Sequence, residues 1–122
     1  MLFYGKDLTD NVIGRSTTYT GDSTKAYSIA QMVDGPGTYD ATPNGKSALI
    51  AHELGHNFAA NHNEAFKWME GSTQVYSTMT GGWVTDSVMR CRFSSNDGVH
   101  GNSTCNNIQH VQSTKTTVAG FQ

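Results

Sequence analysis

The chain has 122 residues, of which 36% are hydrophobic and 15% charged, and its net charge is −2. This length allows one domain, residues 1–122, and leaves no room for a second core. The weak negative charge gives no reason to expect nucleic acid or an anionic membrane as partner, and no apolar stretch approaches membrane-spanning length. Thirteen glycines among many Ser, Thr and Asn favour a loop-rich, secreted protein, whose export signal would lie outside this chain.

The first third of the chain predicts two strands. Residues 12–19 are rich in β-branched and aromatic side chains, and residues 26–33 alternate in polarity. Residues 20–23 (TGDS) between them are typical of a turn, so an antiparallel pair is expected. Residues 35–37 (GPG) and 43–45 (PNG) indicate a loop before the next element.

Two helices are predicted further along. Apolar residues and histidines recur at helical spacing from 46 to about 60, with Ser47 or Asn44 as candidate N-cap. A Gly-rich stretch from about 63 to 101 predicts irregular structure. The last segment, 106–121, predicts an amphipathic helix with one face made of Ile108, Val111, Lys115 and Val118.

Two cysteines lie in the Gly- and Asn-rich part of the chain, Cys91 and Cys105. In a chain of extracellular composition, an even pair favours one disulfide that closes a short loop. The alternative is two unpaired thiols in a cytosolic protein. The remaining histidines, His100 and His110, have no partner pattern and are expected to be surface residues.

The segment HELGHNFAANH carries the strongest chemical signal. His52 and His56 are four residues apart, so on a helix their imidazoles lie one turn apart on one face, within reach of one zinc ion. Glu53 follows His52 and would project beside the metal. There its carboxylate could act as general base toward a metal-activated water.

A third histidine, His62, needs a different geometry. It lies six residues beyond His56, about 240° around an ideal helix, and would face away from the metal if the helix continued. The helix must therefore end between Phe58 and Asn61, and Asn61 tolerates the left-handed conformation that a reversal needs. Three imidazoles and one open position are typical of catalytic zinc. A bare H-E-x-x-H also occurs in helices without metal, and the third histidine favours the zinc interpretation.

At this point the sequence resembles a known family. HELGHNFAANH is similar to the extended zinc signature H-E-x-x-H-x-x-G-x-x-H of the metzincin metalloproteases, especially the reprolysin/adamalysin branch and its bacterial relatives. The resemblance implies an α+β fold of the zincin type. It would have a small twisted sheet with an antiparallel edge strand over the active-site helix, and an irregular C-terminal subdomain that ends in a helix.

Other segments extend the resemblance over nearly the whole chain. Residues 2–14 are similar to the segment that leads into the central strands, and 92–96 and 107–121 to the C-terminal subdomain. Residues 77–81 (STMTG) resemble the Met-turn, which implies that Met79 lies beneath the metal. By resemblance, 26–33 is the edge strand along which a peptide would bind. The substrate-binding residues implied are Ser28, Ile29 and Ala30 on that strand, and Thr80, Gly81, Gly82, Trp83 and Val84 after the Met-turn.

The chain departs from the family pattern in several places. Ala59 stands where the family has Gly, and an Ala at positive φ costs about 1 kcal/mol, so Asn61 is expected to make the turn instead. Asn63 follows the third histidine where reprolysins usually have Asp, which would loosen the support of that ligand. Only 51 residues precede His52, so the chain is either a minimal domain or the C-terminal part of a larger one. Two residues after Met79 there is no Tyr, so the tyrosine ligand of the astacin and serralysin branches is not expected.

These patterns predict a secreted zinc endopeptidase that hydrolyses polypeptides with one catalytic Zn²⁺ and Glu53 as general base. Two alternatives stay open. The chain could be a non-catalytic zinc-binding module or inactive fragment of a larger metzincin domain, or a protein in which H-E-x-x-H is incidental. Calcium (Ca²⁺) binding, common in related domains, has no residue cluster that commits to it. The sequence does not define substrate preference or oligomeric state.

Overall fold

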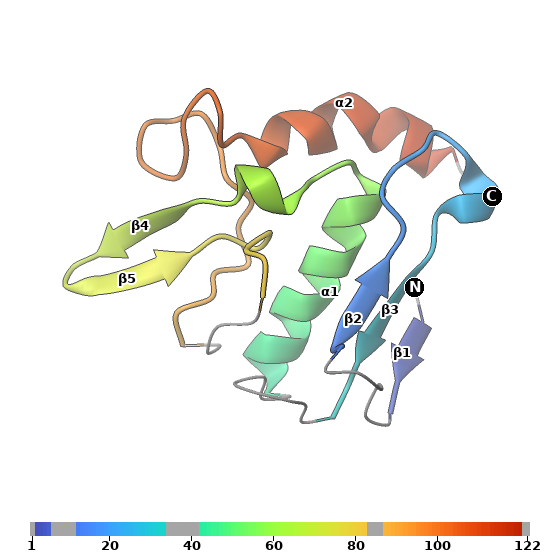
Figure 1. Ribbon diagram of the computed structural model, residues 1–122, viewed down its shortest axis with the longest axis horizontal. Coiled ribbons are helices and arrows are strands. Elements are labelled where there is room, and N and C mark those ends of the chain that lie inside the picture. Colours follow the sequence, from blue (N-terminus) through green and yellow to red (C-terminus); the bar gives the residue numbers. More distant parts are fainter. Residues whose placement is uncertain (1, 6–11, 34–41, 83–86, 121–122) are drawn as a thin grey trace.

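The computed structural model describes residues 2–5, 12–33, 42–82 and 87–120, and these form a small α+β fold (Figure 1). A three-stranded sheet contains β1 (Leu2–Tyr4), β2 (Gly14–Ser16) and β3 (Ser28–Gln31). A second, two-stranded sheet pairs β4 (Lys67–Glu70) with β5 (Thr73–Tyr76). The α+β class predicted from the sequence is therefore confirmed.

The antiparallel pairing of the two predicted strands is also confirmed, because β2 runs antiparallel to β3 with Arg15 opposite Ile29. The predicted position of the second strand is wrong. The strand order is β1-β3-β2, so β3 is central, with β1 parallel to it on its other side. The sequence analysis did not count residues 2–4 as a strand, and these residues take the edge that was expected to be open. The antiparallel edge strand is β2.

The long helix α1 (Pro43–Asn57) packs on one face of this sheet (Figure 1). Its N-cap is Thr42, whose hydroxyl accepts a hydrogen bond from the Gly45 N–H at 3.0 Å, rather than the predicted Ser47 or Asn44. Pro43 fits the first helical position because its φ is preset for a helix and it lacks an N–H that would have no partner there. The helix therefore starts three residues earlier than predicted and includes the expected 43–45 loop. The predicted loop at 35–37 lies outside the described residues.

The core between helix and sheet is small. Ala30 of β3 and Leu49 of α1 are buried against each other. The partly buried hydrophobic residues around them are Ile13, Met32 and Ile50. Much of the remaining contact between α1 and the strands is polar, since the Ser16 hydroxyl donates to the Glu53 carbonyl oxygen at 2.6 Å and the Asn57 side-chain amide donates to the Thr17 carbonyl oxygen at 2.9 Å. This contact fixes the strands relative to the histidine-bearing helix.

The stretch predicted to be irregular contains a β-hairpin. β4 and β5 pair in register around Gly71, whose φ of +61° suits a residue without a Cβ. Short 3-10 turns lie at Ser23–Lys25 (η1) and His62–Glu64 (η2). The sequence analysis missed the hairpin because its strands carry charged and polar residues on both faces, with Trp68 and Val75 as the buried positions.

The second helix, α2 (Asn107–Ala119), confirms the predicted closing helix and lies across the end of α1 (Figure 1). Three residues of its predicted face are half-buried, namely Ile108, Val111 and Val118. Asn107 and Thr114 are buried, whereas Lys115 is exposed. The Thr114 hydroxyl donates to the Phe58 carbonyl oxygen at 2.9 Å, which ties α2 to the C-terminus of α1. The predicted face is therefore confirmed except at Lys115, and the buried polar residues Asn107 and Thr114 lie beside it.

The predicted disulfide is wrong, because Cys91 and Cys105 are both free thiols. The Cys91 sulfur lies 4.0 Å from the Ser47 carbonyl oxygen in the first turns of α1. Cys105 forms an isolated bridge with Asn102 in the turn before α2. The two cysteines contact different elements, so the alternative of unpaired thiols is what the structure has. Among the described helices, neither α1 nor α2 has the length and apolar content needed to cross a bilayer.

Candidate metal centre

The side chains of His52, His56 and His62 converge. Their ring centroids are 4.8–5.1 Å apart, and one nitrogen of each ring lies within 4.8 Å of the others. Nε2 of His52 and Nε2 of His62 are 3.0 Å apart. Two nitrogens bound to one zinc ion at roughly 2.0–2.1 Å are about 3.3 Å apart in a tetrahedral site, so the separation of His52 and His62 is close to that of two ligands of one ion. The nitrogen of His56 also lies near enough for the three to hold one ion.

Backbone carbonyls set the tautomers of the two helical histidines. Nδ1 of His52 lies 2.7 Å from the Thr78 carbonyl oxygen, and Nδ1 of His56 lies 3.1 Å from the Ala60 carbonyl oxygen. A carbonyl oxygen can only accept, so each Nδ1 carries the proton and each Nε2 has a free lone pair. Ligand histidines of metal sites typically donate their second nitrogen in this way, which fixes the ring orientation.

The local electrostatics keep these imidazoles neutral. Burial lowers the pKa of His52 to about 4, and the neighbouring His56 and His62 lower it further against the hydrogen bond to Thr78. Burial is also the main cause of the lowered pKa of His56, followed by the proximity of His62. A neutral imidazole is the form that binds a metal cation.

The chain reverses directly after α1, as the third histidine requires. The N–H groups of Phe58 and Ala60 both donate to the Gly55 carbonyl oxygen, at 2.9 and 3.0 Å, and close the helix. Ala59 has φ of +66° and makes the left-handed turn itself. The expectation that Asn61 takes this role is wrong, because Asn61 is extended, with φ of −141°, and caps η2. The other described positive-φ residues are all glycines, so Ala59 carries strain at the turn.

Met79 lies beneath the histidine helix. It is fully buried, and a Cβ added to Gly55 would stand 2.6 Å from its sulfur and 2.7 Å from Phe93 Cε1. Gly55, between the two helical histidines, is therefore required for close approach of this segment. Two residues after Met79, a Cβ added to Gly81 would be 3.5 Å from the ring of His62. The segment that supplies the carbonyl partner of His52 thus also lies behind His62.

Glu53 occupies a position distinct from the rings. Its side chain is 4% exposed and lies against Gly14 of β2, where any Cβ would overlap the carboxylate. Oε2 has no hydrogen-bond partner among the described residues, and burial raises the pKa of Glu53 to about 7. A desolvated carboxylate with one oxygen lacking a partner, next in sequence to a histidine that could hold a metal ion, is a candidate proton-transfer group.

The predicted substrate-binding residues on β3 and after Met79 have different outcomes in the structure. Ser28 and Ala30 are buried, and β3 has a partner strand on each side, so the reason for assigning an open edge to Ser28, Ile29 and Ala30 no longer holds. Within the described residues no strand pairs with the outer side of β2. Thr80, Gly81 and Gly82 follow Met79, and Gly81 lies beside His62. Trp83 and Val84 lie outside the described residues.

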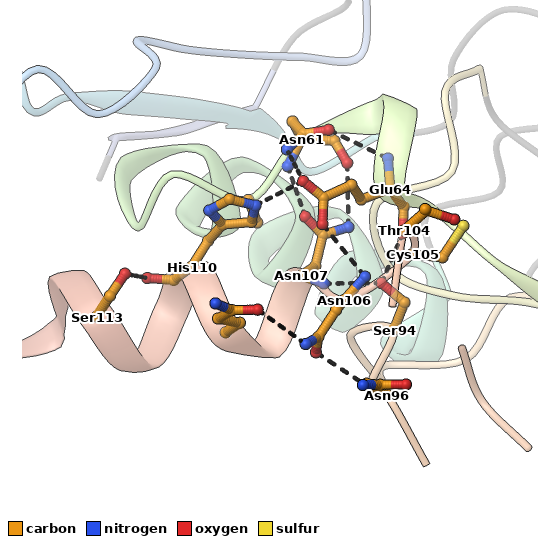
Figure 2. A network of polar contacts seen from close by, with 12 residues as sticks. Asn61, Glu64, Ser94, Asn96, Thr104, Cys105, Asn106, Asn107, His110 and Ser113 are labelled. Atoms are coloured by element: carbon orange, nitrogen blue, oxygen red, sulfur yellow. Dashed lines mark hydrogen bonds and ion pairs between the residues drawn. The ribbon is translucent and has the colours of Figure 1, made fainter. Parts of the chain in front are cut away.

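The sequence analysis missed a polar network that surrounds the third histidine. His110, expected to be an unpartnered surface residue, has its Nε2 2.5 Å from Glu64 Oε1, and Asn107 hydrogen-bonds the backbone of Asn61 (Figure 2). Asn63 is exposed, and the neighbouring Glu64 forms the bonds instead. Asn61, three residues before Glu64, was a cap signal that could have indicated η2.

Comparisons with models of known families, with curated proteins and with solved structures find no match for this chain. What the structure itself shows is a cluster of three histidines whose nitrogens lie close enough together to hold one metal ion.

Proposed function

We propose that this chain is a secreted, zinc-dependent endopeptidase of the metzincin type. The observation that carries the proposal is the convergence of His52 and His56 with His62, because the first two share a helix face and the third requires a chain reversal. Helical spacing alone would not bring the third ring to this place. The buried Met79, whose sulfur lies against Gly55 between the two helical histidines, supports the same assignment, as does the antiparallel edge strand β2, whose Gly14 lies against Glu53.

The three histidines would hold zinc through their Nε2 atoms. A bound zinc ion would lower the pKa of a water molecule to roughly 7 and polarise the peptide carbonyl group. Glu53 would take the proton from the attacking water and deliver it to the leaving amine, which suits a carboxylate whose pKa burial has raised. An extended peptide would add as a strand to the outer edge of β2 through backbone hydrogen bonds.

One observation favours the alternative of a non-catalytic zinc-binding module. Glu53 is almost fully buried against Gly14, and a general base must reach its proton within hydrogen-bond distance. Under this alternative the protein binds zinc and gains stability from it, but it hydrolyses no peptide.

Substitution of Glu53 separates the two functions. We expect about one zinc per chain by metal analysis, and digestion of casein that a chelator abolishes. Glu53→Gln should keep the zinc and lower kcat/KM by roughly 10²–10⁴-fold, because it removes the proton-transfer group and keeps the side-chain shape. Glu70→Gln is the matched control, since Glu70 is exposed on β4 and pairs with Arg90.

Three other outcomes have distinct meanings. A zinc-loaded wild-type protein without any cleavage would establish the non-catalytic module. Full activity in Glu53→Gln would exclude Glu53 as the base. Absence of zinc from the folded wild-type protein would contradict both functions.

A further inference from the structure

The third histidine is the ligand that α1 cannot position. His62 is exposed and begins η2, a single turn of three residues. An isolated turn of this length has no stability of its own, because nucleation of a helix is unfavourable. Something outside α1 and η2 must therefore hold this imidazole beside the other two.

The N-terminal part of α2 makes the required contacts on both sides of His62. On the N-terminal side, the Asn107 side chain donates to the Asn61 carbonyl oxygen at 3.0 Å and accepts from the Asn61 N–H at 2.7 Å. One fully buried amide thus binds both backbone polar groups of the residue directly before His62. The Ser94 hydroxyl accepts a hydrogen bond from the backbone N–H of Asn107 at 3.0 Å, which holds the residue that carries this side-chain amide.

On the C-terminal side the contact is a carboxylate–imidazole pair. Glu64 Oε1 lies 2.5 Å from His110 Nε2 and accepts from the Asn61 side-chain amide at 3.1 Å, while Oε2 accepts from the Asn106 N–H at 3.2 Å (Figure 2). The Glu64 carbonyl oxygen also accepts from the Ser94 hydroxyl at 2.6 Å. The residue two positions after His62 is therefore bound to α2 through its side chain and to residue 94 through its backbone.

We propose that Glu64 and His110, together with Asn61 and Asn107, form a clamp that positions His62 for metal binding. This inference rests on the proposed zinc site and assigns these four residues as positioning residues. None of them is among the converging ligands. They act through the backbone on either side of the third ligand, so loss of the clamp would leave His62 present but free to move away from His52 and His56.

A purely structural role is the competing explanation. Under it, the network only stabilises the packing of α2 on the rest of the protein, and its loss lowers the free energy of unfolding without changing the zinc affinity of the folded molecules. Zinc affinity and the absorption spectrum of the cobalt-substituted protein distinguish the two roles, because both report the ligand geometry of the folded state.

The test uses His110→Ala, His110→Gln and His100→Ala. His110→Ala removes the imidazole from Glu64, and His110→Gln restores a donor at about the position of Nε2. His100→Ala is the matched control, since it breaks a carboxylate–imidazole pair with Asp97 of 2.8 Å, and among the described residues neither partner has a hydrogen bond to η2. Each variant is titrated with zinc against a chelator, its cobalt spectrum is recorded, and metal-free unfolding in urea is measured.

We expect His110→Ala to weaken zinc binding roughly 10–100-fold, the usual loss when a group that supports a metal ligand is removed, and to change the cobalt spectrum. His110→Gln should recover most of the affinity, and His100→Ala should bind zinc as the wild type does. Wild-type affinity and spectrum in His110→Ala, with or without lower stability, would overturn the clamp. If the wild-type protein itself binds no zinc, the proposed function fails, and this appears before any variant is compared.

Discussion

The candidate metal centre joins two regions that hold their ligands by different means. His52 and His56 lie on α1, half-buried, and their spacing follows from the geometry of the helix. His62 is exposed and lies in a turn held by side chains of α2, 46 residues further along the chain. The first region takes its spacing from α1 alone, although the Thr78 carbonyl oxygen, 26 residues further along the chain, also holds the ring of His52. The second exists only when the C-terminal helix has packed.

The difference shows how a candidate metal site can depend on the less stable of the two segments that hold its side chains. The helical spacing of α1, together with the carbonyl oxygens of Thr78 and Ala60, positions two imidazoles, whereas four polar side chains with their backbone partners position the third. Preorganisation of all ligands is what allows a site to bind its metal tightly. Substitutions in the helix, in the turn and in the loop around Asp97 therefore test this comparison, and the expected effects become smaller in that order.

The largest effect is expected from removal of a ligand in each region. Structural four-ligand zinc sites bind with roughly 10–16 kcal/mol, so loss of one ligand should lower the affinity on the order of 100-fold or more. His52→Ala and His62→Ala should each show a loss of zinc affinity of this size, measured by competition with a chelator.

The two variants should differ in metal-free stability. His52→Ala leaves the carbonyl oxygen of the buried Thr78 without its partner, which costs about 1–3 kcal/mol of unfolding free energy. His62→Ala removes an exposed side chain and should change it by about 0.5 kcal/mol or less. If urea unfolding of the metal-free proteins gives the same loss of unfolding free energy for both variants, the distinction between the two regions is contradicted.

A smaller effect on the free energy of unfolding is expected at the turn that connects the two regions. Ala59 has φ of +66°, and glycine relieves the strain of a left-handed residue at some cost in chain entropy, so Ala59→Gly should raise the free energy of unfolding by about 0.5–1 kcal/mol. Ala60→Gly is the control, because Ala60 is fully buried without a positive φ, and the loss of its methyl group should destabilise the protein. If urea unfolding gives the same loss for both variants, the turn is not left-handed in solution.

The smallest effect is expected at Asp97, in the loop that supplies the control pair. Hydrogen bonds from the backbone N–H and the ring of His100, and from Val99 and Ser95, hold the pKa of Asp97 well below 3.8. Because the folded pKa is the lower one, the stabilisation is fully present above about pH 3.8 and is lost as the pH falls through the folded pKa.

Asp97→Asn should therefore be less stable than the wild type at neutral pH, and the difference should shrink in acid. Urea unfolding of both proteins from about pH 2 to about pH 7 measures this. Zinc affinity should stay unchanged, since among the described residues no hydrogen bond joins Asp97 to His62. A stability difference that grows in acid would contradict the assigned sign.

Local residue chemistry determined a large part of this protein. The spacing of His52 and His56 required only a helix, and the antiparallel pairing of β2 with β3 followed from alternation and a turn signal. The end of α1 before Asn61 followed from the demand that His62 join the other two rings. Each of these features depends on interactions within a few residues, which a sequence displays directly.

Only the tertiary structure decided the rest. Parallel pairing by β1 made β3 a central strand, and contacts with separate elements kept Cys91 and Cys105 apart. The partner of His110 is Glu64, 46 residues away, and no periodicity in the sequence links them. Hydrogen bonds between distant side chains depend on how the elements pack, and packing is set by the whole chain at once. For this reason the sequence indicates the three candidate ligands, whereas the fold determines how the third of them is held.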